Sequence, residues 1–177
     1  YDPALRRESN LEFDFSYGNT IEFWMNKGTF LDVEHNEVIF DLSNRGTGAD
    51  KGRLRIEMNA DRLYPFIVTV ESGSNTATQS VGQATIGAAA GVPSNGWHHY
   101  AFAFVSNSAG TLLNFFYDGD LSEQHQISTG FGRVTGSLRS SIGSLVAPVA
   151  GFANTDEGWG QFSGSLDDFR YWKYDRP

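Results

Sequence analysis

Two apolar runs share the stretch Gly96–Asp120, GWHHYAFAFVSNSAGTLLNFFYDGD, with a polar turn between them. The runs are Trp97–Val105 and Leu112–Tyr117, and Ser106–Gly110 supplies the turn. Asp118-Gly119 closes the second run and predicts a tight hairpin, because glycine adopts a positive φ at little cost. Apolar residues on both faces are typical of covered strands, so the stretch predicts two inner strands of a layered β structure.

Shorter runs with the two-residue period of a half-buried strand occur through the rest of the chain. Arg53–Asn59 shows the pattern most clearly, because its apolar residues alternate with charged or polar ones. Ser72–Asn95 predicts one weak edge strand inside a long loop, and Ala147–Gly160 predicts a second long loop. The other predicted strands or strand-bearing segments are Leu11–Phe15, Thr20–Asn26, Glu37–Leu42, Phe66–Glu71, Gln124–Ile127, Ser137–Ile142 and Gln161–Tyr174. Many short strands with Gly and Asn turns predict an all-β sandwich or jelly roll.

Length and composition narrow the class of protein. The 177 residues suit a single domain over residues 1–177, and 40% hydrophobic residues are enough for a sizeable core. With 13 basic and 21 acidic residues the net charge is −8, which disfavours nucleic acids and anionic membranes as partners. No apolar run approaches the length of a membrane span, and the absence of Cys excludes disulfides and thiol chemistry. Because the chain does not begin with Met, we expect a fragment of a larger protein.

Five short motifs occur in the order found in one known family. They are Thr20-Ile21-Glu22-Phe23-Trp24, Gly96-Trp97-His98-His99-Tyr100-Ala101, Phe116-Tyr117-Asp118-Gly119, Ser141-Ile142-Gly143 and the closing run Phe162–Tyr171. The sequence resembles the laminin-G-like branch of the concanavalin A-like lectin/glucanase superfamily over about Leu11 to its end. The resemblance implies a jelly-roll β-sandwich of two antiparallel sheets. It also implies adhesion or glycan binding within a larger protein, or a place in the structural proteins of tailed bacteriophages.

The sequence lacks the carboxylate pattern of the glucanase relatives. A retaining glycosidase needs two carboxyl groups about 5–5.5 Å apart across the scissile bond. The nearest fragment is Glu12-Phe13-Asp14, but Tyr17 stands where the second Glu should be, and Glu34 and Glu37 are expected in a loop. The sequence therefore predicts that the domain is not an enzyme, and a glycoside hydrolase is a distant alternative.

The adjacent pair His98-His99 does not predict a metal site. Neighbouring residues of a strand point to opposite faces, so the two rings cannot hold one ion together. We expect one histidine in the core and the other hydrogen-bonded near a sheet face. The sequence has no cysteine, and no Ser–His–acid spacing occurs nearby, so nucleophilic catalysis is not indicated.

Asp167 and Asp168 are the candidates for a structural Ca²⁺ site. The resemblance implies this role, because neighbouring jelly-roll modules hold calcium with an Asp of the closing strand and backbone carbonyls. Calcium takes six to eight oxygen ligands, which loops and one or two carboxylates supply. The alternative, which remains open, is an Asp that caps backbone amides or pairs with Arg170. Asp118-x-Asp120 followed by Glu123 lacks most of a calcium loop and is interpreted as a turn.

A candidate ligand site lies in the loop that contains Asn154, Asp156 and Trp159. Aromatic rings that stack on sugars beside polar groups that meet hydroxyls are typical of such sites. The alternative is that Trp159 folds back as a lid on the core. Trp24, Trp97 and Trp172 are expected in strands, where they would serve core or inter-sheet packing.

Taken together, these features predict a non-catalytic recognition module for a glycan or a cell-surface partner, within a larger extracellular or virion protein. A purely structural or assembly role, such as virion decoration without a sugar ligand, is the alternative. Calcium is the only cofactor implied, and no membrane insertion is expected.

Overall fold

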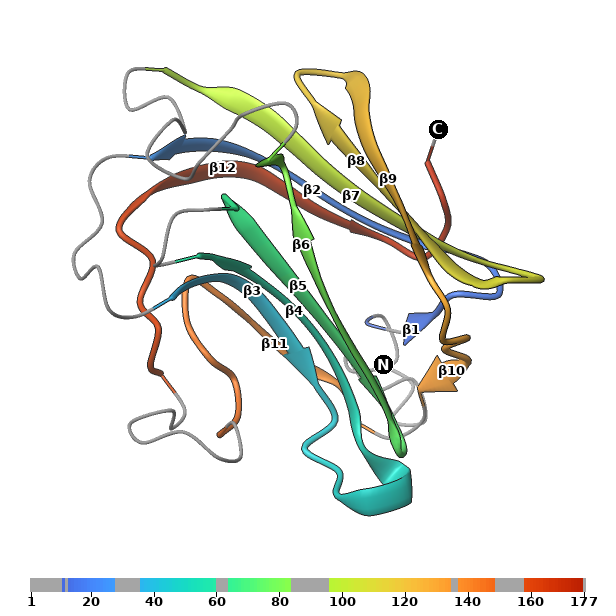
Figure 1. Cartoon of the computed structure of the whole chain (residues 1–177). Helices are drawn as coiled ribbons and strands as arrows, with labels where there is room; N and C mark the ends of the chain where they lie inside the picture. The colour runs from blue at the N-terminus through green and yellow to red at the C-terminus, as the bar shows by residue number, and fades with distance from the viewer. Residues whose placement is uncertain are drawn as a thin grey trace, which may run out of the picture.

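Two five-stranded antiparallel sheets form the body of this computed structural model (Figure 1). The structure describes residues 11, 13–27, 36–59, 64–83, 96–134, 137–148 and 158–176. The first sheet contains, in spatial order, β12 (Gly164–Trp172), β2 (Asn19–Lys27), β7 (His98–Asn107), β8 (Gly110–Tyr117) and β9 (Asp120–Ile127). The second sheet contains β11 (Arg139–Ile142), β3 (Glu37–Ser43), β4 (Gly52–Met58), β5 (Phe66–Ser72) and β6 (Asn75–Val81). Two smaller features are the separate pair of β1 (Phe13–Asp14) with β10 (Arg133–Val134) and a 3-10 helix, η2 (Gly48–Asp50).

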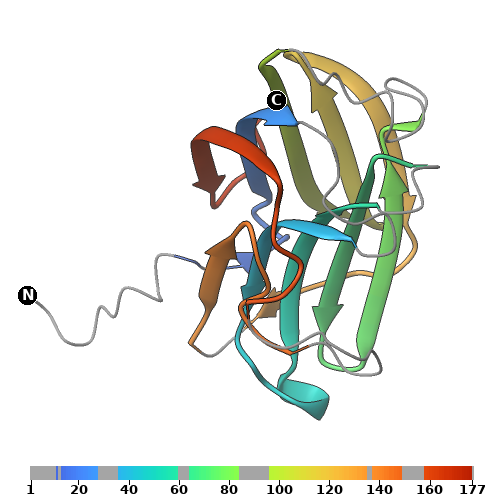
Figure 2. The same cartoon turned by 90° about the vertical axis from the view of Figure 1, so that its left-hand side faces the viewer.

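The two sheets are stacked as the layers of a sandwich, which Figure 2 shows from a second direction. The strands within each sheet are antiparallel to their neighbours. The predicted fold class, an all-β jelly-roll sandwich of two antiparallel sheets, is therefore confirmed.

Apolar side chains from alternate positions fill the space between the sheets. On β2, Ile21, Phe23 and Met25 are almost completely buried. Phe66 of the second sheet contacts Phe102 of the first edge-on, with 5.4 Å between the ring centroids. An aromatic pair of this geometry contributes about 0.5–1.5 kcal/mol beyond the burial of its area. The regular two-residue period of the sequence thus becomes a single aromatic-rich core.

The stretch Gly96–Asp120 forms β7, β8 and the turn into β9. β7 lies at the centre of the first sheet, between β2 and β8, as predicted for an inner strand. Phe102 and Phe104 are buried toward the core, and Ala101 and Ala103 are buried on the outward face. On β8 the outward residues are only half-buried. The prediction that both faces are covered thus holds for the centre of β7 and is wrong for β8.

A buried ion pair lies on the outward face of the second sheet. Arg53 points away from the core as predicted, yet only 4% of its surface is exposed. Its Nε and Nη2 donate to the two oxygens of Asp41 at 2.8 and 2.6 Å, and Val146 N donates to the same carboxylate at 2.8 Å. The guanidinium also donates to the carbonyls of Ala147 and Pro148 at 2.9 and 3.0 Å. These bonds hold the main chain after Leu145 over the sheet and bury both charges.

Several element boundaries differ from the sequence-based prediction. β9 begins at Asp120 instead of Gln124, because the Asp118-Gly119 turn leads directly into it. β11 covers only the second part of Ser137–Ile142, while the edge strand predicted within Ser72–Asn95 is found as β6.

The last strand, β12, returns to pair with β2 at the edge of the first sheet. Thr20 is the cross-strand partner of Trp172, and its Oγ1 donates to the carbonyl of Tyr174 at 3.0 Å. Arg176 N in turn donates to Thr20 Oγ1 at 3.0 Å. β2 is therefore held on both sides, by β7 and by β12, and its outward side chains have fixed neighbours.

Candidate ligand-binding surface

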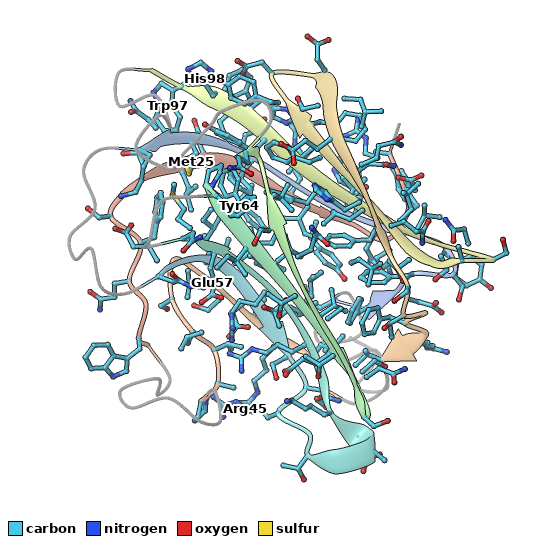
Figure 3. All side chains as sticks on the ribbon, in the orientation of Figure 1. Met25, Arg45, Glu57, Tyr64, Trp97 and His98 are labelled. Carbon is cyan, nitrogen blue, oxygen red and sulfur yellow. The ribbon has the colours of Figure 1, made fainter. Side chains whose placement is uncertain are left out.

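Two tryptophan side chains lie exposed at one end of the first sheet. Trp24 on β2 is 40% exposed, and Trp97, one residue before β7, is 45% exposed. Both line two adjoining hollows of about 540 and 420 Å³. Figure 3 labels Trp97 and His98 at this end of the first sheet and Arg45 at the opposite end of the molecule. The prediction that Trp24 and Trp97 serve core or inter-sheet packing is therefore wrong, because both rings face solvent.

Cross-strand pairing places polar side chains on either side of Trp24. Asp167 of β12 is its partner on one side, and His99 of β7 is its partner on the other. Asp118, in the turn after β8, comes next, because its amide donates to the carbonyl of His99 at 2.8 Å. Paired residues of a sheet share one face, so these four residues form a row across the sheet. We call this row, together with Trp97, His98, Gly119 and Asp168, the tryptophan surface.

Neither histidine of the predicted pair lies in the core. His98 stacks on Tyr117 with 5.2 Å between ring centroids, and its Nδ1 is 2.7 Å from Asp118 Oδ2. His99 contacts Trp24 with 5.5 Å between ring centroids and lies 3.9 Å from Glu22. The expectation of one core histidine is wrong, because β7 enters the sandwich only at Tyr100. Both rings instead border the tryptophan surface.

A β-bulge shapes the edge of the surface. The register of β12 against β2 shifts between Asp167 and Arg170, and Asp168 has a φ of 50°, in the left-handed region. Bulges re-aim side chains and occur often beside functional sites. Here the extra residue keeps Asp167 outward beside Trp24, while Asp168 forms an ion pair with Arg170. Arg170 also donates to Glu22 at 3.2 Å, so the bulge is joined to β2.

The arrangement provides flat apolar rings beside hydrogen-bond acceptors. The carboxylate of Asp118 accepts from His99 N at 2.9 Å and keeps further acceptor capacity, because each carboxylate oxygen has two lone pairs. The carboxylate of Asp167 accepts from the amide of Asp168 at 2.8 Å and is exposed. Such a surface is suited to a ligand with an apolar face and hydroxyl donors along its rim.

A family model described as the concanavalin A-like lectin/glucanases superfamily matches residues 5–176. The chain belongs to this superfamily. A search of curated protein sequences gave no match. In the part of the chain that the structure describes, no helix is long and apolar enough to span a membrane.

Solved structures of the same architecture share little sequence with this superfamily member. Domains LG4-5 of the mouse laminin alpha1 chain are 8% identical with a TM-score of 0.59, and the match covers 93% of this chain and 38% of the laminin chain. A heptameric SAP-like pentraxin from Limulus polyphemus is 12% identical with a TM-score of 0.54, covering 94% and 68%. The CBM40 module of a Ruminococcus gnavus IT-sialidase, bound to α2,3-sialyllactose, is 13% identical with a TM-score of 0.52, covering 94% and 87%. At these identities the likeness establishes the fold.

The structure places Asp167 and Asp168, the candidates for a structural calcium site, at the bulge of β12. Among the residues that the structure describes, no three His, Cys, Asp or Glu side chains gather closely enough to hold a metal ion. Asp168 pairs with Arg170, and a guanidinium beside a carboxylate opposes a second cation. The observed pairing is the alternative that the sequence left open, and calcium binding stays a prediction.

Trp159 is the described member of the predicted loop site. Asn154 and Asp156 lie outside the described residues, so their place stays a prediction. Trp159 is 46% exposed, and its carbonyl accepts from Leu145 N at 2.8 Å. The alternative of a lid on the core is therefore wrong for Trp159. Its role in binding stays a prediction.

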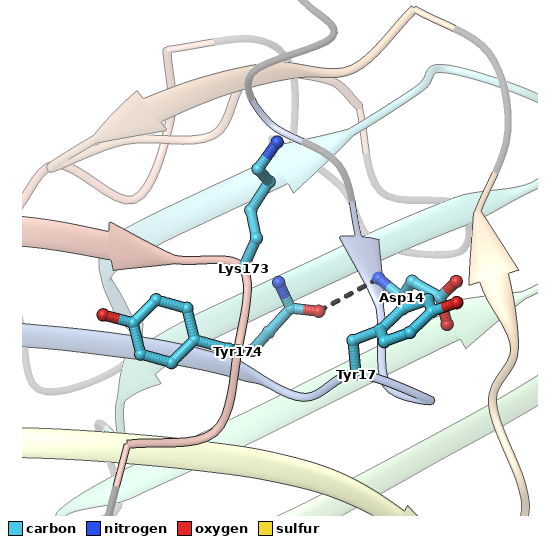
Figure 4. A pocket seen from close by; sticks show the side chains of 5 residues that line it. Asp14, Tyr17, Lys173 and Tyr174 are labelled. Atoms are coloured by element: carbon cyan, nitrogen blue, oxygen red, sulfur yellow. Dashed lines mark hydrogen bonds between the residues drawn. The ribbon is translucent and has the colours of Figure 1, made fainter.

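Two other hollows lie elsewhere on the superfamily domain. One, of about 390 Å³, is lined by Asp14, Tyr17, Asn19, Lys173 and Tyr174, and Figure 4 shows the hydrogen bond from Asp14 N to Asn19 within it. The other, of about 650 Å³, is cationic, but each of its basic groups has a partner in the fold. Those groups are Arg45 with the carbonyl of Val146, Lys51 with Glu71 and Arg53 with Asp41.

The clue to the tryptophan surface was present in the sequence. Trp24 lies two residues from both Glu22 and Asn26, so the two-residue period puts it on the polar face of β2. Trp97 has no such signal, because it precedes the strand. The joining of Trp24 to Asp167 depends on the pairing of β2 with β12, which the order of residues along the chain does not reveal.

Proposed function

We propose that this domain is a non-catalytic recognition module that binds a glycan on the tryptophan surface. The observation that carries the proposal is the pair of exposed indole rings in adjoining hollows, bordered by carboxylates. Large apolar side chains exposed together mark interaction sites, since exposure of the rings to water is unfavourable. Sugar rings have an apolar face for stacking and hydroxyl groups for the carboxylates. The sialidase module that binds sialyllactose shows that a domain of this fold can serve such a role.

The surroundings of the carboxylates support a binding role without catalysis. A glycosidase requires a protonated acid opposite a second carboxylate across the scissile bond. On the tryptophan surface Asp168 is paired with Arg170, and Asp118 is held by His98 and by the amide of His99. These carboxylates position their neighbours, and the predicted absence of catalysis remains part of the proposal.

We propose further that the module is part of a larger extracellular protein. A protein of a virion surface is the alternative. In this proposal the ligand is a glycan that a cell-surface partner carries. The surrounding protein would place the tryptophan surface where the glycan is displayed.

The first test measures glycan binding by the wild type and by the single variants Trp24→Ala and Trp97→Ala. Each variant should weaken binding about tenfold or more, which corresponds to roughly 1.4 kcal/mol, because stacking on that ring is lost. Binding would be found on a glycan array and measured by calorimetry, with circular dichroism to show that each variant is folded.

Two matched controls remove an exposed aromatic ring elsewhere. Tyr17→Ala, in the hollow of Figure 4, should leave glycan affinity unchanged. Trp159→Ala distinguishes the tryptophan surface from the loop site predicted from sequence, and should also leave affinity unchanged. Loss of binding in Trp159→Ala alone would move the site to that loop. Failure of the wild type to bind any glycan would favour the structural or assembly role.

A further inference from the structure

The charge around the tryptophan surface is unevenly distributed. Four carboxylates lie on it or beside it, and two guanidinium groups accompany them. The carboxylates are those of Glu22, Asp118, Asp167 and Asp168. The guanidinium groups are those of Arg170, which pairs with both Asp168 and Glu22, and Arg176, whose Nη1 is 3.0 Å from Glu22. With neutral histidines the surface is therefore negative, as is the whole chain at −8.

The carboxylates flank the place where a stacked ring would lie. Asp167 is the cross-strand neighbour of Trp24 on the β12 side, and Asp118 follows His99 on the other side. A ligand on Trp24 therefore has a negative group at each edge. No basic residue lines either of the two adjoining hollows except the histidines, among the residues that the structure describes.

The hydrogen-bonding character of these groups also selects the ligand. An ionised carboxylate accepts hydrogen bonds and donates none, so it needs donors from the ligand. Sugar hydroxyls supply such donors. The carboxylate of a sialic or uronic acid and the sulfate of a sulfated sugar supply no proton at neutral pH and add a like charge.

The charges of the two arginines beside the surface are compensated by carboxylates. Arg170 already contacts two carboxylates, and Arg176 contacts Glu22 while its guanidinium lies 4.6 Å from the centroid of Trp172. An anionic ligand on either arginine would therefore also meet the carboxylate with which that arginine is paired.

From these contacts we infer that the tryptophan surface selects uncharged glycans and rejects glycans that carry a carboxylate or sulfate next to the stacked ring. This inference rests on the proposed function, and it deepens that function by naming the class of ligand. Two like charges about 4 Å apart in water repel by about 1 kcal/mol, so one close carboxylate weakens an anionic ligand about fivefold.

The experiment compares matched pairs of oligosaccharides, each with and without a terminal sialic acid or a sulfate. Where a pair is bound, the affinity for its uncharged member should be at least about tenfold higher than for its acidic member at low salt. Raising the salt concentration should narrow this ratio, because the charges are exposed and screened.

Variants that remove a charge show which residues determine the ratio of the affinities for the uncharged and acidic members. Asp118→Asn and Asp167→Asn keep the size of the side chain, and each should narrow the ratio about fivefold, mainly through tighter binding of the acidic member. Glu71→Gln is the matched control, because it removes one negative charge from the second sheet, outside the tryptophan surface. It should leave the ratio unchanged.

The outcomes separate the two claims. Acidic members that bind as tightly as uncharged ones, with binding that Trp24→Ala abolishes, would overturn the inference and leave the proposed function intact. A ratio that the Asp variants do not change would overturn it as well. If no member of any pair binds, the proposed function and the inference both fail.

Discussion

The carboxyl group of Glu57 lies in a place where little water reaches it. It lies on the outward face of the second sheet, is 8% exposed and has its Oε2 2.9 Å from Arg55 Nε. Burial raises the pKa of Glu57 above its usual 4.5, and the nearby Arg55 opposes that rise only in part. A carboxyl with a higher pKa in the folded state binds its proton more tightly there. The stability that this bound proton contributes is complete below the pKa of Glu57 in the unfolded chain. It is lost as the pH rises through the pKa of Glu57 in the folded protein.

Replacing Glu57 by Gln should therefore stabilise the protein at neutral pH relative to the wild type. The difference in the free energy of unfolding should be smallest near about pH 4 and should grow with pH. It gains about 1.4 kcal/mol for each pH unit between the unfolded and folded pKa values. Urea unfolding of both proteins over a pH series measures this difference. Parallel stability profiles would show that Arg55 fully compensates for the burial of Glu57.

At the level of single residues, the sequence predicted the face on which a side chain lies better than its exposure. The polar partners of Trp24 follow from alternation, because Glu22 and Asn26 share its face. The burial of Asp41 and Arg53 could not be foreseen, since the segment that covers them comes from about a hundred residues later in the chain. Exposure depends on such distant contacts, whereas alternation is local. The tryptophan surface was missed for that reason.

The hairpin between β8 and β9 depends on two residues with positive φ. Asp118 has a φ of 50° and Gly119 a φ of 90°. Turns of this kind match the twist of the paired strands, and they favour Asp-Gly and Asn-Gly. A Cβ atom at Gly119 would meet no other atom within 4 Å. The cost of a side chain there is therefore conformational and not steric.

Gly119→Ala should lower the free energy of unfolding by about 1–2 kcal/mol, because a left-handed conformation is unfavourable for alanine. For a chain of this size each kcal/mol is a fall in Tm of about 2–4 °C. Thermal unfolding measures the change. Gly130→Ala is the matched control, since Gly130 has open space around it and no positive φ. Equal effects of the two substitutions would argue against a conformational cost at the turn.

At the level of elements, strands with a clear alternating pattern were predictable. β4 was expected over Arg53–Asn59 and runs over Gly52–Met58. The pairing of β1 with β10 was not, because two-residue strands have no period to detect. The bulge in β12 left a trace that could have been used. Leu166 and Phe169 both pack against the core although three positions separate them, so one extra residue lies between them.

The last residues of the chain fasten the molecule after its final strand. Beyond β12, Tyr174 O accepts from Thr20, Arg176 N donates to Thr20, and Asp175 N donates to Tyr17 O at 3.4 Å. Removal of residues 173–177 should leave both sheets folded and lower the free energy of unfolding by about 2–3 kcal/mol, at about 1 kcal/mol for each hydrogen bond. Urea denaturation measures this loss.

The matched control for this deletion keeps the main chain in place. Lys173→Ala shortens one exposed side chain and should change the free energy of unfolding by less than about 0.5 kcal/mol. An unchanged stability after the deletion would mean that these bonds are replaced by bonds to water without loss.

The pairing of β2 with β12 also determines how the domain would respond to tension. β2 begins and β12 ends at the same end of their shared ladder, where Thr20 pairs with Trp172. A force that pulls Asn19 and Trp172 apart acts on that end first, so the hydrogen bonds of the ladder break one after another instead of all together. Trp24 and Asp167 lie further along the ladder, beyond the pair of Glu22 with Arg170. A mechanical load would therefore reach the tryptophan surface only after the first pairs have separated. The surface would be disrupted stepwise and not in a single event.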